Sequence, residues 1–105
     1  MIFEIEVSEQ VDEDLRGIYE YIAFELQSPD NAIGQLARLE ESIISLEQMP
    51  ERFHRYEKEP WKSRGLRMMP VDNYCVLYIS DMKQEKVSIV RVMYGGRDID
   101  SQLRK

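Results

Sequence analysis

The feature that most constrains the fold of this chain is a change in the spacing of its apolar residues. Between Ser8 and Pro50 they recur every three or four positions, as in amphipathic helices. After Gly65 they form short runs rich in β-branched and aromatic residues, which favour strands. Helices followed by consecutive strands indicate an α+β fold, with helices packed on one face of a mostly antiparallel sheet. We expect one complete small domain over residues 1–105.

The first half of the chain predicts one strand and two helices. Residues 2–7 largely alternate apolar and acidic side chains, which indicates a strand. Ser8 is expected to cap the first helix, and Ser28 and Pro29 to begin the second, which Pro50 ends. The short break between them predicts an antiparallel helical hairpin. The expected core stripes are Val11, Leu15, Ile18, Tyr19, Ile22 and Leu26 in the first helix, and Ile33, Leu36, Leu39, Ile43, Leu46 and Met49 in the second.

The second half predicts a polar, basic segment followed by three strands, which gives the order β-α-α-β-β-β. Residues 51–64 are polar and basic, with Trp61 as an aromatic anchor. Pro70 favours an edge or an end for its strand, and the nearly continuous apolar last strand indicates a central position covered on both faces. The sheet face away from the helices should be open or covered by a partner, and should carry much of the basic half. The expected strands are residues 66–71, 74–79 and 86–94, with a short polar tail at 97–105 that includes about one helical turn.

Charge is divided unevenly between the two halves. The net charge of −6 argues against a nucleic-acid binder, but residues 1–51 hold two arginines against thirteen acids, whereas residues 52–105 hold twelve lysines and arginines against seven acids. Two interpretations stay open: a cationic face on an acidic body, or simply two acidic, solvated helices. One cysteine and one histidine exclude an internal disulfide and a Cys/His zinc set, and no apolar run could span a bilayer. We expect a cytoplasmic protein without metal or organic cofactor.

Three segments of the second half resemble the RelE/ParE toxin superfamily. They are Trp61-Lys62-Ser63-Arg64-Gly65-Leu66-Arg67, Tyr74-Cys75-Val76-Leu77-Tyr78 and Ile89-Val90-Arg91-Val92-Met93-Tyr94-Gly95-Gly96-Arg97-Asp98. The resemblance implies the toxin of a bacterial type II toxin–antitoxin module, of the kind found in plasmid stabilization systems. Such a toxin inhibits growth until the tail of a cognate antitoxin wraps it and covers its basic face. RelE-like members cut mRNA in the ribosomal A site, whereas ParE-like members poison DNA gyrase without nuclease chemistry.

The resemblance and the residue chemistry together suggest candidate catalytic groups. Metal-free RNA cleavage needs a base, an acid and cations that hold the developing phosphate charge. Histidine is the side chain whose ordinary pKa suits proton transfer near neutral pH. Each candidate has a structural alternative: an arginine paired with a carboxylate, a packing tyrosine, a solvated loop histidine. The candidates are Arg67, Arg91 and Arg97 as phosphate anchors, with Tyr94 or His54 for proton transfer.

Two departures from the nuclease pattern favour a ParE-like inhibitor that binds its target. The best-known nucleases carry Gly-Tyr-Arg where this chain has Asn73-Tyr74-Cys75, and a tail tyrosine where it has Leu103. The alternative is a metal-free, ribosome-dependent mRNA endoribonuclease. The basic segment 52–67 allows an RNA-contacting patch, a solvated loop anchored by Trp61, or a dock for an acidic antitoxin tail. Expected partners are the antitoxin and either gyrase or the ribosome with mRNA, in a homodimer or a toxin–antitoxin hetero-oligomer.

Overall fold

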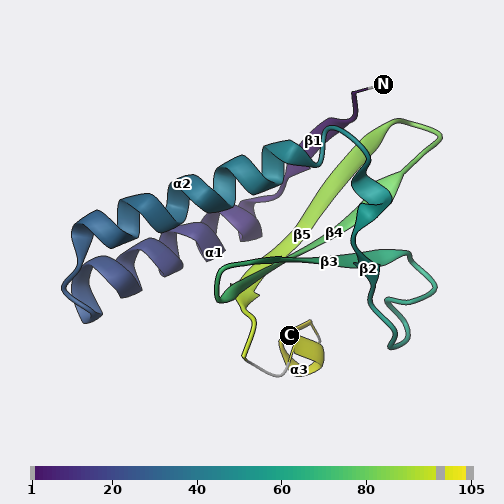
Figure 1. Ribbon diagram of the computed structural model, residues 1–105. Coiled ribbons are helices and arrows are strands. Elements are labelled where there is room, and N and C mark those ends of the chain that lie inside the picture. The colour runs from purple at the N-terminus through teal and green to yellow at the C-terminus, as the bar shows by residue number, and fades with distance from the viewer. Residues whose placement is uncertain (1, 97–98, 104–105) are drawn as a thin grey trace.

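A five-stranded sheet with the strand order β1-β5-β4-β3-β2 organises the chain. The computed structural model describes residues 2–96 and 99–103. β1 pairs in parallel with β5, and the other neighbours are antiparallel, so the predicted α+β fold is confirmed (Figure 1). In chain order the elements are β1 (Glu4–Val7), α1 (Glu9–Glu20), a π-helix (Tyr21–Glu25), α2 (Pro29–Ser45), a 3₁₀ helix (Pro50–Arg52), β2 (His54–Arg55), β3 (Leu66–Val71), β4 (Tyr74–Asp81), β5 (Lys86–Tyr94) and α3 (Ile99–Leu103).

Local chemistry sets the starts of both long helices where the sequence predicts them. The Ser8 hydroxyl accepts a hydrogen bond from the Val11 N–H at 3.3 Å and caps α1. Pro29 opens α2, as expected. Ser28 occupies the capping position, but its hydroxyl accepts from the Asn31 side-chain amide at 2.6 Å instead of from a backbone N–H. The hairpin therefore begins as predicted, although one of its two caps differs in detail.

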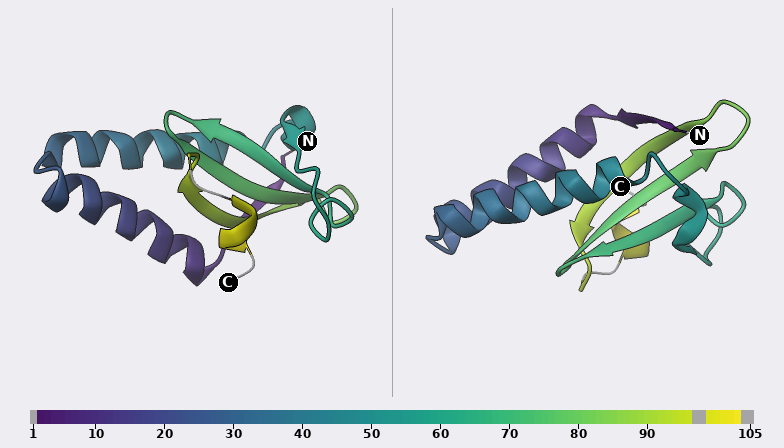
Figure 2. Two further views of the ribbon diagram at one scale, coloured as in Figure 1. Left: turned by 90° about the horizontal axis from the view of Figure 1, so that it is seen from below. Right: turned by 45° about the horizontal axis from the view of Figure 1, so that its top comes forward.

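One face of the sheet is covered by the helical hairpin, where α1 packs against β5 and α2 against β3. The hairpin also extends well past the ends of the strands, and its closed end projects free of the sheet (Figures 1 and 2). The main core therefore lies under the open end of the hairpin. It comprises Phe3, Val11, Leu39, Ile43, Leu46, Met69, Val71, Val76, Tyr78, Val87, Ile89 and Val92.

Three residues predicted for the helical core stripes are instead exposed. Leu26 is 56% exposed, because the π-helix before it breaks the 3.6-residue period that placed Leu26 on the buried face. Ile33 is 59% exposed, because α2 turns Ala32 and Gln35 inward. Met49 is 76% exposed and lies beyond the end of α2 with a left-handed backbone, φ 49°.

The opposite face of the sheet is not open, so that prediction was wrong. The loop before β3 and helix α3 fold back onto it, and Figure 1 shows α3 on the side away from the hairpin. Trp61 and Ile99 pack at its margin, which confirms Trp61 as an anchor. Apolar side chains in the loop and the tail provide enough surface for this second cover. The resulting cluster comprises Tyr56, Leu66, Cys75, Leu77, Met93 and Leu103.

Two finer predictions about the strands hold. β5 lies between β1 and β4, and its residues enter the clusters on both faces, as expected for a central strand. Pro70 lies where β3 has no outer neighbour, because β2 pairs only with Arg67 and Met68. A proline without an N–H therefore interrupts no ladder there.

Candidate functional site

Arg91 is held by a carboxylate from the hairpin. Its Nε and Nη2 donate to the two oxygens of Asp14 at 2.9 and 3.1 Å, and the Val92 N–H donates to Asp14 at 3.0 Å. β1 ends opposite Ile89, so this carboxylate takes the place of a strand neighbour for the edge of β5 beyond that point. The Asp14 side chain is only 9% exposed, and its hydrogen bonds raise the pKa of Arg91. A phosphate could recruit Arg91 only by displacing Asp14.

Arg67 is also engaged within the protein. Its guanidinium donates to the Phe53 carbonyl at 2.7 Å and to the Glu51 carbonyl at 3.2 Å, and lies 3.5 Å from the Glu51 carboxylate. Beside it the buried Tyr78 hydroxyl donates to the Pro50 carbonyl, and burial raises the pKa of Tyr78 to about 12. Since the Arg67 side chain is only 12% exposed, its contacts fasten the segment before β2 to the sheet.

Tyr94 lies at the end of β5 with half of its surface exposed. Its ring meets Tyr74 edge to face, with centroids 6.0 Å apart. Gly96 packs against the Tyr94 ring so closely that a Cβ there would lie 2.5 Å from a ring carbon. Burial is the main cause of the raised pKa of Tyr74, and the neighbouring Tyr21 and Tyr94 raise it further. The Tyr94 ring thus belongs to an aromatic corner between the sheet and the hairpin.

The four candidate catalytic groups among the described residues do not meet at one point. Exposed His54 lies on β2, in a cross-strand row that runs through Met68 and Leu77 to Arg91. Three strand spacings separate the ends of that row, about 14 Å. Tyr94 follows Arg91 by three positions, so the backbone positions of these two residues lie about 10 Å apart along β5. Arg97, the remaining candidate, lies outside the described residues.

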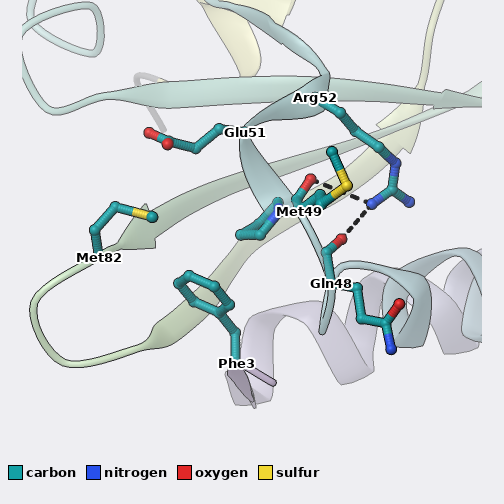
Figure 3. A pocket seen from close by; sticks show the side chains of 7 residues that line it. Phe3, Gln48, Met49, Glu51, Arg52 and Met82 are labelled. Carbon is teal, nitrogen blue, oxygen red and sulfur yellow. Dashed lines mark hydrogen bonds between the residues drawn. The ribbon is translucent and has the colours of Figure 1, made fainter. Parts of the chain in front are cut away.

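A surface groove of about 660 Å³ lies between the end of α2 and the turn after β4 (Figure 3). Its base is Phe3, and two exposed methionines, Met49 and Met82, flank it. The Arg52 guanidinium donates to the Gln48 carbonyl at 2.6 Å and also to the carbonyls of Ser45 and Met49. Arg52, counted in the basic segment, therefore caps the end of α2. The apolar lining suits packing contacts more than acid–base chemistry.

The rest of the basic segment forms an anchored loop with exposed cations. The Glu59 carboxylate accepts from the Ser63 N–H and hydroxyl at 2.7 and 2.6 Å, which lowers the pKa of Glu59. Arg64 stacks 5.0 Å from the centre of the Trp61 ring. The name basic loop is used below for residues 55–64. Its exposed cations are Arg55, Lys58, Lys62 and Arg64.

Other reactive groups are few within residues 2–96 and 99–103. Burial raises the pKa of the Cys75 thiol to about 11, so it stays protonated and is a poor nucleophile at neutral pH. No group of three or more His, Cys, Asp or Glu side chains in these ranges is placed to hold a metal ion. Among the helices described, none combines the length and apolar character needed to cross a bilayer.

Comparisons with known proteins agree on the fold and identify a family. The fold resembles a chain of the chromosomal ParDE system from P. aeruginosa, with a TM-score of 0.71, 17% identity and coverage of 89% of this chain and 96% of that one. It also resembles a chain of the RelBE2 complex from Mycobacterium tuberculosis, with a TM-score of 0.66, 19% identity and coverage of 90% of this chain and 92% of that one. A chain of the archaeal RelE-RelB complex from Pyrococcus horikoshii OT3 is similar as well, with a TM-score of 0.64, 19% identity and coverage of 92% of this chain and 99% of that one. No curated protein matches by sequence. Residues 5–99 match the ParE toxin of the type II toxin–antitoxin system parDE. The chain therefore belongs to the ParE family of type II toxin–antitoxin toxins.

Proposed function

We propose that this chain is a cytoplasmic growth inhibitor that binds DNA gyrase without cleaving nucleic acid, and that a cognate antitoxin neutralises it. Family membership supports a toxin of this kind. The observation that carries the choice of mechanism is the separation of the candidate catalytic side chains. Two of the three candidate arginines are engaged by the protein's own oxygens.

Cleavage of RNA would require those groups to gather around one phosphate. Proton-transfer groups act within hydrogen-bond reach of the proton that they move. Here His54 and Arg91 lie at opposite ends of a four-strand row. Freeing Arg91 would leave the nearly buried Asp14 carboxylate without its cation, which is energetically expensive. A toxin that acts through its surface needs none of these rearrangements.

The alternative is a metal-free, ribosome-dependent mRNA endoribonuclease. The half-exposed Tyr94 at the end of β5 favours it, because its hydroxyl could reach a bound substrate. In that mechanism Tyr94 would move a proton and Arg97, three residues on in the sequence, would hold the phosphate. Arg67 and Arg91 would serve as further anchors only after leaving their present partners.

Antitoxin binding fits the basic loop. Arg55, Lys58, Lys62 and Arg64 offer exposed positive charge on an otherwise acidic protein. An acidic antitoxin tail would be attracted to this loop, and such complementarity speeds encounter more than it strengthens the final complex. The complex would be a toxin–antitoxin hetero-oligomer.

Induced expression in bacteria separates the two mechanisms. Messenger RNA ends are mapped by primer extension, and trapped gyrase–DNA complexes are assayed in the same cells. We expect growth arrest with trapped gyrase and intact mRNA, unchanged in Arg97→Ala and Tyr94→Phe. New mRNA ends that disappear in these two variants would establish the endoribonuclease instead. Normal growth with neither signal would overturn the toxin proposal.

A further inference from the structure

The closed end of the helical hairpin carries a concentration of exposed apolar side chains. The name hairpin tip is used here for residues 20–33. Four of the ten large exposed hydrophobic side chains in the described parts of the chain lie within it. They are Tyr21 (53% exposed), Phe24 (68%), Leu26 (56%) and Ile33 (59%).

The fold of the isolated chain leaves this surface uncovered. The tip projects beyond the sheet (Figures 1 and 2), and its inner side is held by a small cluster of Ile22, Ala23 and Ala32, against which Tyr74 of β4 packs. The π-helix Tyr21–Glu25 lies within the tip, and π-helical turns are frequent at functional sites. Large apolar side chains left exposed together in one short segment favour an interaction site.

Charge restricts what can cover the tip. It carries Glu20, Glu25 and Asp30, and no lysine or arginine lies between Arg16 and Arg38. Two tips from identical copies would bring like charges together, and an anionic lipid surface would repel the tip in the same way. A cationic surface with apolar recesses is the complementary partner.

We propose that the hairpin tip inserts its aromatic and aliphatic side chains into a cationic, DNA-binding groove of the toxin's target enzyme, DNA gyrase. This inference rests on the proposed function and adds the contact surface to it. Enzymes that handle DNA carry lysine- and arginine-rich grooves that accept phosphates. The acidic rim of the tip meets those cations, while Phe24 and its neighbours supply the buried anchors that dominate binding energy. The basic loop stays free for the antitoxin.

Two isoleucines of α2 give a matched test. Ile33 and Ile44 are 59% and 57% exposed on the same helix, about 16 Å apart along its axis. Purified chain variants are titrated into a supercoiling assay with purified bacterial gyrase and relaxed plasmid. We expect Ile33→Gln to raise the half-inhibitory concentration about 10-fold and Phe24→Gln about 30-fold, as for anchor residues. Ile44→Gln should stay within about twofold of the wild-type chain.

Charge reversal tests the electrostatic half of the proposal. Glu25 lies in the tip, whereas Glu40 lies toward the other end of α2, and both are exposed. Glu25→Lys should weaken inhibition about fivefold at low salt and less at high salt, because screening removes the attraction. Glu40→Lys should change inhibition little at either salt concentration.

The outcomes distinguish this inference from the function on which it rests. Thermal unfolding first confirms that each variant is folded. If the wild-type chain inhibits gyrase and the tip variants inhibit equally well, the inference is overturned and the proposed function stands. Tip variants that lose antitoxin binding or self-association but keep full inhibition would assign the tip to those partners and also overturn it. A wild-type chain that leaves gyrase unaffected would overturn both proposals.

Discussion

The two ends of the helical hairpin place their apolar side chains in opposite environments. At the base, Val11, Leu39 and Leu46 are completely buried against the sheet. At the tip, Phe24 and Ile33 remain mostly exposed, although the helices there are equally rich in apolar residues. Buried apolar surface stabilises the fold, whereas exposed apolar surface is available to a partner. The comparison indicates that the base holds the hairpin in place and the tip is free for recognition.

The largest expected effect is on the free energy of unfolding, when a buried side chain at the base of the hairpin is truncated. Leu39→Ala removes a side chain from the buried cluster and should lower the free energy of unfolding by about 3 kcal/mol. The matched change at the tip, Ile33→Ala, should lower it by less than about 0.5 kcal/mol. Urea denaturation followed by circular dichroism measures both. Similar losses at the two positions would break the comparison.

An intermediate effect is expected where the base of the hairpin meets the edge of β5. Asp14→Ala leaves the Arg91 guanidinium and the Val92 N–H without their acceptor, and should lower the free energy of unfolding by about 2 kcal/mol. Arg38→Ala is the control, since its ion pair with Asp72 is largely solvated and its loss should leave the urea midpoint nearly unchanged. Equal urea midpoints for Asp14→Ala and the wild-type chain would show that the carboxylate is not part of what fixes the hairpin.

The smallest effect concerns the sheet face away from the hairpin. Burial raises the pKa of Cys75 to about 11, whereas the thiol of an unfolded cysteine has a pKa of about 8.5. Iodoacetamide at pH 8 should therefore modify the native chain far more slowly than the urea-unfolded chain. Because the unfolded thiol releases its proton first, stability should fall as pH rises above about 8.5. Rapid native labelling would mean that the loop and α3 open readily.

Local signals in the sequence were enough to predict much of the fold. Ser8 and Pro29 mark the helix starts because capping and proline geometry depend only on neighbouring residues. The last strand was predicted with its observed limits, residues 86–94. Exposure at the tip was missed because helical spacing shows which residues share a face, not whether a sheet extends beneath it. The exposure of Leu26 also depends on the π-helix, which no local sequence pattern predicted.

The candidate site was less predictable because its contacts join distant residues. The sequence left open that an arginine pairs with a carboxylate, but it did not indicate that Arg91 pairs with Asp14, which lies 77 positions away on α1. Arg52 was counted as part of a basic patch, yet it caps α2. Only the tertiary arrangement determines which cations remain free. The catalytic roles of Arg67, Arg91, Tyr94, Arg97 and His54 remain predictions for the expression experiment.

Hydrogen–deuterium exchange of the chain, alone and mixed with gyrase, tests the central claim most directly. In the free chain, amides of the hairpin tip should exchange faster than those of the base, because fewer buried contacts hold them. Binding to gyrase should slow exchange at residues 20–33 and leave the base unchanged. Protection confined to the basic loop, or uniform exchange along the free hairpin, would contradict the division between a stabilising base and a recognising tip.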